Sequence, residues 1–367
     1  MSRVLVADDS IFMRKVISSI IEKAEGLELV GTARSGRDCV MQAMALKPDL
    51  IALDLEMPEM NGLAVLREIL RLNQNPRPGV VMCSHLTKDG SLEALAALRM
   101  GAADFVTKEL DSCQRNPARF GEELVAKLRA VGAPRANGES GSPIHERSLS
   151  EGVVGSIVEQ EISVVVIGAN TGGPPMVESL VCSLEPGWQV PILIAQHMPG
   201  LFPRCFAERL GAMANVEVMI AEDGDRVQPG VVYIGEGGSH LRVVSVGGEM
   251  RLKVSGEPSG DVFKPSVNEL CESAAQSYGQ HALGMLLTGM GDDGTAGAGS
   301  LRAAGAAVVA QERTTCVVHE MPGNVIRAGL ANAVGNAEQM KVLLAAVGRR
   351  AKARARLAAS SSGRNLA

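Results

Sequence analysis

The sequence predicts an α/β protein with two domains, each built on a mostly parallel β-sheet that is covered by helices. Short apolar runs alternate with amphipathic stretches in two separate blocks, as expected of strands that alternate with helices. Aromatic residues make up only 2% of the chain, so the cores must consist of Val, Ile, Leu, Met and Ala. A stretch rich in Gly, Pro and Ser at 132–143 separates the two blocks.

The first block, residues 1–130, predicts a five-stranded sheet. Its helical patterns lie between the apolar runs, and the last one ends the block, which gives a (βα)5 order. The expected strands are 4–7, 29–33, 50–53, 80–83 and 105–106, and the expected helices are 11–23, 38–46, 63–72, 92–100 and 117–130.

The rest of the chain divides into three parts. Residues 131–160 are expected to form a flexible linker because of their Gly, Pro and Ser content. A second α/β pattern covers 161–348 and predicts a doubly wound, mostly parallel sheet. Residues 349–367, basic and then Ser-rich, are expected to be a disordered tail.

Composition excludes several classes of function. A net charge of -5 argues against nucleic-acid binding, which calls for a strongly basic domain. The 7 cysteines are scattered without a CxxC motif, which argues against a disulfide framework and a zinc site. No apolar run approaches the ~20 residues of a membrane span, and the chain starts without a signal-peptide pattern. We therefore expect a cytoplasmic protein without membrane insertion.

Polar side chains stand at the carboxyl ends of the first block's strands. Asp8 and Asp9 end the first strand, Asp54 ends the third, Ser84 ends the fourth, and Lys108 follows the fifth. Each carboxylate alone could be a helix cap, but together they predict a Mg²⁺ site formed by the three aspartates. Asp54 is then the expected phosphoacceptor, and Ser84 and Lys108 are expected to contact the phosphoryl group.

This block resembles the receiver domain of two-component response regulators, a flavodoxin-like (βα)5 fold. One departure is Glu109, where receivers usually carry a proline. The motifs that carry the resemblance are Asp8-Asp9-Ser10, Asp54-Leu55-Glu56-Met57-Pro58, Gly62, Ser84 and Phe105-Val106-Thr107-Lys108.

In the second block, three loops follow strands whose carboxyl ends are expected to meet. A Gly-rich turn at 168–175 follows the first strand, His197 follows the second, and Asp293 follows a later one. The turn could cradle a phosphate or expose a nucleophile. The turn lacks the GxGxxG spacing of a phosphate-binding loop, and two prolines remove backbone amides that would bind a phosphate. The arrangement favours a hydrolase triad with an imidazole base and an orienting carboxylate.

The second block resembles the catalytic domain of the chemotaxis protein-glutamate methylesterases. The resemblance implies that His197 is the base, that Asp293 orients it, and that Met290 lies at the oxyanion site. The matching strings are Ile167-Gly168-Ala169, Thr171-Gly172-Gly173, Gln196-His197-Met198-Pro199, Phe206-Ala207-Glu208-Arg209-Leu210, Ala221-Glu222-Asp223-Gly224, Lys264-Pro265-Ser266-Val267 and Leu287-Thr288-Gly289-Met290-Gly291.

The resemblance also implies an activity and partners. The family hydrolyses glutamate methyl esters and deamidates glutamines on methyl-accepting chemotaxis receptors. A chemotaxis histidine kinase is the implied phosphodonor, the chain is implied to be a monomer, and no cofactor is implied for the hydrolase domain.

The family's nucleophilic serine is replaced here by Asn170. An amide nitrogen is a poor nucleophile, so efficient hydrolysis would need another group, and the adjacent Thr171 is a possible substitute. The alternative function is a catalytically impaired module that binds receptors or accepts phosphoryl groups. Two further departures from the family are the turn Gly237-Gly238-Ser239 before His240 and Asn268 in place of an aspartate. Both are expected to affect substrate fit but not the triad.

Overall fold

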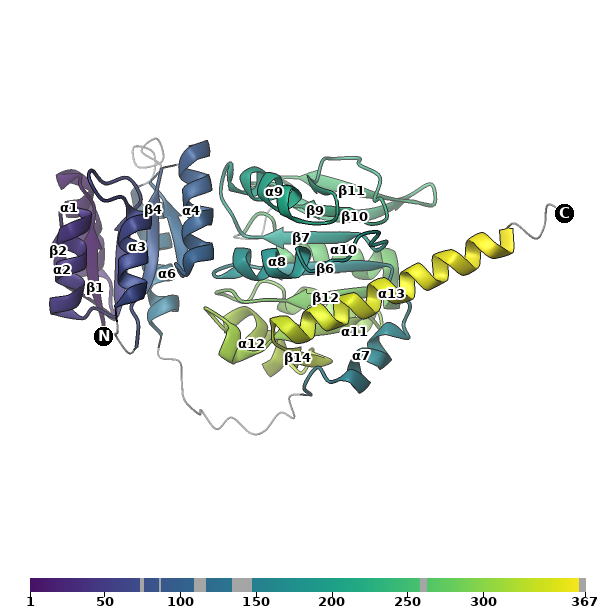
Figure 1. The fold of residues 1–367 in the computed structure, drawn as a ribbon. Coiled ribbons are helices and arrows are strands. Elements are labelled where there is room, and N and C mark those ends of the chain that lie inside the picture. The colour runs from purple at the N-terminus through teal and green to yellow at the C-terminus, as the bar shows by residue number, and fades with distance from the viewer. Residues whose placement is uncertain (73–75, 86, 109–116, 134–146, 258–262, 363–367) are drawn as a thin grey trace. The chain divides into compact units, whose positions relative to one another are not determined.

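The chain folds into two compact units, residues Met1–Glu139 and Ser140–Ala367 (Figure 1). The structure, a computed structural model, describes residues 1–72, 76–85, 87–108, 117–133, 147–257 and 263–362. Glu109 and the central part of the predicted linker lie outside the described residues.

The N-terminal unit is a five-stranded parallel sheet in the order β2-β1-β3-β4-β5. The predicted (βα)5 fold is confirmed. Its strands are β1 (Ser2–Ala7), β2 (Leu27–Ala33), β3 (Leu50–Asp54), β4 (Gly79–Ser84) and β5 (Asp104–Thr107), and its helices are α1 (Ile11–Lys23), α2 (Gly36–Leu46), α3 (Gly62–Arg71), α4 (Lys88–Met100) and α6 (Pro117–Gly132).

Short polar side chains fix where the helices of this unit begin. Ser10, Ser35, Asn61 and Thr87 each precede a helix and accept a hydrogen bond from a backbone amide in its first turn. Such N-caps satisfy amides that have no partner within the helix. Each helix therefore starts just beyond the carboxyl end of a strand, which leaves the loops at that edge short and well defined.

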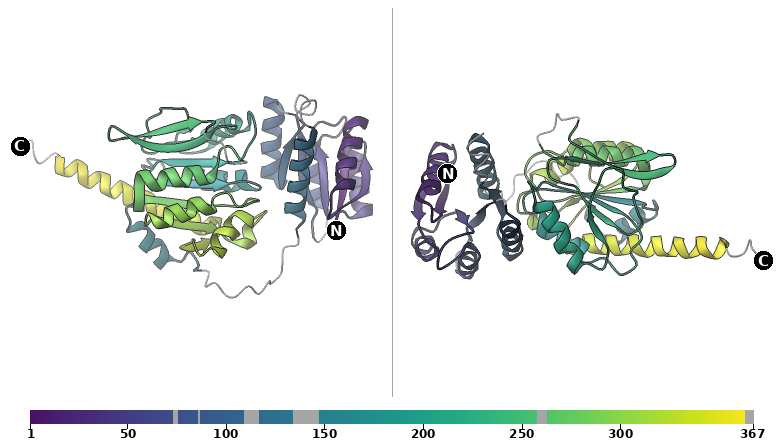
Figure 2. Two further views of the ribbon diagram at one scale, coloured as in Figure 1. Left: turned by 180° about the vertical axis from the view of Figure 1, so that it is seen from behind. Right: turned by 90° about the horizontal axis from the view of Figure 1, so that it is seen from above.

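The C-terminal unit is a seven-stranded parallel sheet in the order β14-β13-β12-β6-β7-β9-β8. Helices lie on both faces of this sheet (Figure 2), which agrees with the fully buried strands β6, β7, β12 and β13. The strands are β6 (Val164–Ala169), β7 (Ile192–Gln196), β8 (Val218–Ile220), β9 (Val232–Ile234), β12 (Ala282–Leu286), β13 (Ala307–Gln311) and β14 (Ala333–Gly335). A separate antiparallel hairpin joins β10 (His240–Val246) and β11 (Glu249–Ser255).

The remaining elements of this unit are helices. They are α7 (Glu151–Val158), α8 (Gly173–Val181), α9 (Phe202–Met213), α10 (Val267–Tyr278), α11 (Thr295–Ala303), α12 (Glu320–Arg327), α13 (Ala337–Ser362) and the 3₁₀ turns η1 (Gly279–His281) and η2 (Arg313–Thr315). Among the described residues, none of the helices is both long and apolar enough to cross a bilayer.

Two sequence expectations about the ends of this unit were wrong. Residues 151–158 form α7 rather than linker, because Val153, Val154 and Ile157 are buried on one side of the helix. The tail is helical as far as Ser362. Ala and Arg are strong helix formers, and Ala351 in that segment is buried.

The order of the strands determines where the functional residues meet. In the N-terminal unit, β1 lies between β2 and β3. The connection after β1 leads to β2 and the connection after β3 leads to β4, so the two run in opposite directions along the sheet. The place between β1 and β3 where the direction reverses is the switch point of this sheet. In the C-terminal unit, β6 lies between β7 and β12 in the same way. Ligand sites of open α/β sheets lie at such points, at the carboxyl ends of the strands.

Candidate functional sites

The switch point of the N-terminal unit holds two buried carboxylates and one buried ammonium group. Lys108 Nζ lies 2.6 Å from Asp8 Oδ2 and 2.7 Å from Asp54 Oδ1. Burial raises the pKa of Asp54 to about 6, although the charge of Lys108 acts to lower it. The lysine therefore compensates charges that would otherwise be costly to bury together.

Three carboxylates at this point have the geometry of a cation site. Ligand oxygens of Asp8, Asp9 and Asp54 lie within 4.8 Å of one another, and Asp9 is exposed while the other two are buried. Hard oxygen donors that are open to water on one side suit Mg²⁺, which retains several water ligands. The residues present therefore fit the predicted ion.

Ser84 lies at the end of β4, next to this group. Its hydroxyl is buried and donates to the carbonyls of His85 and Gly90, at 3.2 and 3.1 Å. The bond to Gly90 connects the hydroxyl to the first turn of α4. The structure thus brings together all five side chains that the sequence singled out in this unit.

In the C-terminal unit, the turn after β6 is shaped by glycines. Gly172 has a φ of +77°, and a Cβ on Gly173 would lie 2.2 Å from the Gln196 side-chain oxygen. Larger residues would not fit between this turn and the end of β7. The tight turn holds Asn170 at the edge of the sheet beside the loop that carries His197.

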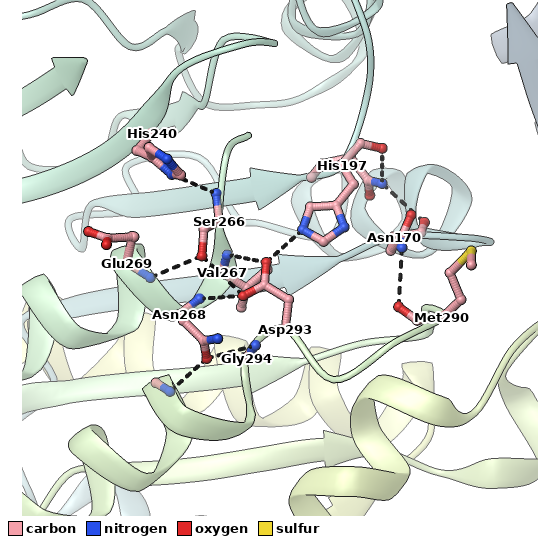
Figure 3. Close-up of polar contacts among 12 residues, drawn as sticks. Asn170, His197, His240, Ser266, Val267, Asn268, Glu269, Met290, Asp293 and Gly294 are labelled. Carbon is pink, nitrogen blue, oxygen red and sulfur yellow. Dashed lines mark hydrogen bonds and ion pairs between the residues drawn. The ribbon is translucent and has the colours of Figure 1, made fainter. Parts of the chain in front are cut away.

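His197 and Asp293 form a hydrogen-bonded pair across the switch point (Figure 3). His197 Nε2 lies 2.8 Å from Asp293 Oδ2, and both side chains are buried. Phe263 stacks on the imidazole, with ring centroids 4.3 Å apart and an interplanar angle of 7°. The ring is therefore fixed by a carboxylate at one edge and by an aromatic face.

The Asp293 carboxylate also accepts three bonds from the start of α10 (Figure 3). The backbone amides of Val267 and Asn268 donate at 2.7 and 2.8 Å, and the Ser266 hydroxyl donates at 3.1 Å. Burial acts to raise the pKa of Asp293, but the bond to His197 and these amides hold that pKa below its ordinary value. The group is therefore an anion that is stabilised by a helix N-terminus.

The residues that hold this carboxylate were not predicted from the sequence. Asn268 was expected not to bear on the triad, and this was wrong. Its amide donates to Asp293, and its side-chain oxygen accepts from the Gly294 and Gly297 amides at 2.9 and 2.8 Å. The spacing of Ser266 and Glu269 is that of a helix capping box, which could have revealed the contact.

The segment that ends in His240 was also expected not to bear on the triad, and this was wrong. This histidine is fully buried, and its Nδ1 accepts from the Ser266 amide at 3.3 Å. Ser266 in turn donates to Asp293. His240 therefore supports the Asp293 carboxylate through Ser266, in addition to any effect of its segment on substrate fit.

Asn170 is nearly buried, and its side chain does not bond to His197. Its Nδ2 donates to the Met290 carbonyl at 3.2 Å (Figure 3). Its own carbonyl accepts from Gln196 Nε2 at 3.0 Å, which fixes the backbone here. Asp293 lies on one side of the imidazole and Asn170 on the other. Among the described residues, the buried Nδ1 of His197 has no hydrogen-bond partner.

The two other predicted residues are both neighbours of Asn170: Thr171 follows it in the chain, and Met290 accepts its hydrogen bond. Thr171 is only 1% exposed, and its carbonyl accepts from Thr288 Oγ1 at 2.9 Å. Met290 precedes Gly291, whose amide and carbonyl are both bound by α12 through Glu320 and Asn324, at 2.7 and 2.9 Å. Two side chains of α12 therefore hold the loop that carries Met290.

Comparisons with known proteins identify a family for each of the two units. The family model described as CheB methylesterase matches residues 165–344, and that of the response regulator receiver domain matches residues 4–114. The crystal structure of the Thermotoga maritima CheB methylesterase catalytic domain is 36% identical and covers 50% of this chain and 97% of its own, with a TM-score of 0.49.

Two curated relatives extend over almost the whole chain. A protein-glutamate methylesterase/protein-glutamine glutaminase of Oleidesulfovibrio alaskensis is 39% identical over 362 residues, which is 93% of this chain and 97% of the relative. A protein of the same name from Archaeoglobus fulgidus is 40% identical over 334 residues, which is 89% of this chain and 92% of the relative. The chain therefore belongs to the CheB family, in which a receiver domain precedes a methylesterase domain.

Proposed function

We propose that this chain is a phosphorylation-regulated protein-glutamate methylesterase and protein-glutamine deamidase that acts on methyl-accepting chemotaxis receptors in the cytoplasm. The observation that carries the proposal is the His197–Asp293 pair at the switch point of the second sheet. The names of the relatives supply the substrate class. The alternative, a receptor-binding module without hydrolysis, rests on Asn170 alone and is not favoured by these relatives.

In the receiver, Asp54 is the proposed phosphoacceptor for a histidine kinase. Asp8, Asp9 and Asp54 would hold Mg²⁺, which neutralises charge on the phosphoryl oxygens when it is bound. Lys108 lies within ion-pair distance of Asp54, so it can pair with the transferred group. Ser84 would exchange its bond to the Gly90 carbonyl for one to a phosphoryl oxygen.

In the hydrolase unit, His197 is the proposed general base. Asp293 holds the imidazole in one orientation and stabilises the positive charge that forms when the ring takes a proton. Met290 is the proposed oxyanion residue, on a loop that α12 holds in place. Position 170 stands where the family has its serine, and asparagine there offers no hydroxyl.

The test is methanol release from methylated chemoreceptor membranes by the full-length chain, with and without a small phosphodonor and Mg²⁺. We expect release that the phosphodonor increases, and no increase in the Asp54→Asn variant. His197→Gln should abolish release. The matched control is His281→Gln, at the opposite end of the strands, which should retain it. Absence of release by the native chain under all conditions would refute the proposal.

A further inference from the structure

We infer that no side chain of this enzyme attacks the ester: His197 activates a water molecule, which attacks the ester carbon directly, so that hydrolysis proceeds without an acyl-enzyme. This inference rests on the proposed function and specifies its mechanism. Two independent features of the site carry it, the second nitrogen of His197 and the position of the Asn170 side chain.

The first feature is the protonation pattern of the imidazole. An ionised carboxylate only accepts hydrogen bonds, so the His197 nitrogen that faces Asp293 must carry the hydrogen. The other nitrogen, Nδ1, then has a free lone pair. It is buried, has no partner among the described residues, and lies on the side of the ring toward Asn170. The site thus holds an oriented base, and the group that gives it a proton is not among the described residues.

The second feature is that residue 170 is engaged elsewhere. The Asn170 amide donates to the Met290 carbonyl at 3.2 Å, and an amide nitrogen has no lone pair available for attack. Thr171, the substitute that the sequence suggested, is 1% exposed on a backbone that Thr288 fixes. Among the described residues, no hydroxyl bonds to His197 Nδ1, so the base is not in contact with the Thr171 hydroxyl.

A water molecule as the nucleophile agrees with both the free lone pair of His197 Nδ1 and the bond of Asn170 to Met290. It can donate one proton to Nδ1 and direct its oxygen at an ester carbon that lies beside Met290. The Asn170 side chain then contributes by holding the Met290 loop rather than by reacting. We call it a positioning residue for this reason.

The water oxygen bonds to the ester carbon while one water proton moves to His197 Nδ1. The tetrahedral intermediate then breaks its bond to the methoxy oxygen, which takes the proton from Nδ1 and leaves as methanol. The glutamic acid product ionises and releases a proton to solvent, and the imidazole returns to its neutral form. Deamidation follows the same course, with ammonia as the leaving group.

The experiment uses the full-length, phosphorylated chain with chemoreceptor membranes that carry radiolabelled methyl groups. Since the acyl group is the receptor itself, an acyl-enzyme would appear after an acid quench as a covalent receptor–enzyme band. We expect linear methanol release without a burst and without this band. Asn170→Ser is the positive control, and it should give a burst of about one methanol per chain together with the band.

Variants at position 171 distinguish the remaining route. Thr171→Val removes the hydroxyl and Thr171→Ser keeps it, and both should release methanol within about twofold of the native rate, with thermal melting as the check on folding. A covalent band from the native chain, or loss of release in Thr171→Val but not in Thr171→Ser, would overturn the inference and leave the proposed function standing. No methanol from the native chain would refute the proposed function as well.

Discussion

The Asp293 carboxylate accepts a hydrogen bond from the His197 ring at 2.8 Å and also caps the first turn of α10. One side chain therefore connects the proposed base to two backbone amides at the start of α10. The imidazole is oriented by the same contacts that start a buried helix. Catalytic geometry and local stability should consequently change together when this carboxylate is altered.

Asp293→Asn should reduce methanol release by a factor on the order of 10⁴, since an amide can hold the imidazole in the wrong tautomer. Initial rates on methylated receptor membranes would measure this. The neighbouring Asp292 is exposed, so Asp292→Asn is the matched control and should leave the rate unchanged. Equal rates for the two variants would show that Asp293 does not orient the base.

The same carboxylate should make the stability of the C-terminal unit depend on pH. Its pKa is lower in the folded chain than the value of about 3.9 expected in the unfolded chain. Its contribution to the free energy of unfolding is therefore complete above about pH 5 and is lost as the pH falls through the folded pKa. Trp188, the single tryptophan, is buried in this unit and reports its unfolding in urea.

Asp293→Asn should flatten this dependence between about pH 5 and pH 3, whereas Asp292→Asn should keep it. The measurement is the midpoint of the Trp188 transition at each pH. If both variants follow the native curve, the carboxylate does not contribute through its charge.

Asn268→Ala should loosen the loop that carries Asp293. It leaves the buried amides of Gly294 and Gly297 without their acceptor, so we expect a loss of about 2 kcal/mol in the free energy of unfolding, and slower methanol release. Asn268→Asp keeps an acceptor oxygen near a helix N-terminus and should be close to native in both measurements. Equal losses in the two variants would contradict this assignment.

Asp54→Asn should abolish labelling of the chain by a small phosphodonor, and EDTA should do the same to the native chain by removing Mg²⁺. The reason is that Asp54 combines the proposed nucleophilic oxygen with one of the three carboxylates proposed to bind Mg²⁺. Asp89→Asn, an exposed change in the first turn of α4, is the control that should retain label. Residual label in Asp54→Asn would point to another acceptor.

The sequence predicted the strands and their ends well because buried parallel strands give uninterrupted apolar runs. Asp54 and His197 were found because each directly follows such a run. The contacts that hold Asp293 were not predicted, since they depend on backbone amides of a helix that is distant in sequence. The helix α7 was missed because its glycines resemble linker composition, and its buried face becomes apparent only when the neighbouring elements are known.

The orientation of Asn170 was also beyond the sequence. An asparagine can bond with almost any polar neighbour, and in this fold its partner is the Met290 carbonyl. The partner is determined by the register of β6 against β12. This register places Asn170, the residue after β6, beside the loop after β12. Spacing along the chain does not encode that distance.

Asn170→Ser should raise methanol release by on the order of 10³-fold or more, because a serine nucleophile in an otherwise assembled triad contributes about that much or more. The base and its carboxylate are already paired at 2.8 Å, and the turn is held by the Gln196 bond to the residue 170 carbonyl, which any side chain at 170 would keep. A hydroxyl there would lie on the side of the ring that carries the lone pair. Asn170→Ala is the matched control, since it also removes the bond to Met290 but adds no nucleophile. A gain in both variants would mean that the asparagine merely obstructs the site, and no gain in either would mean that the site cannot use a serine.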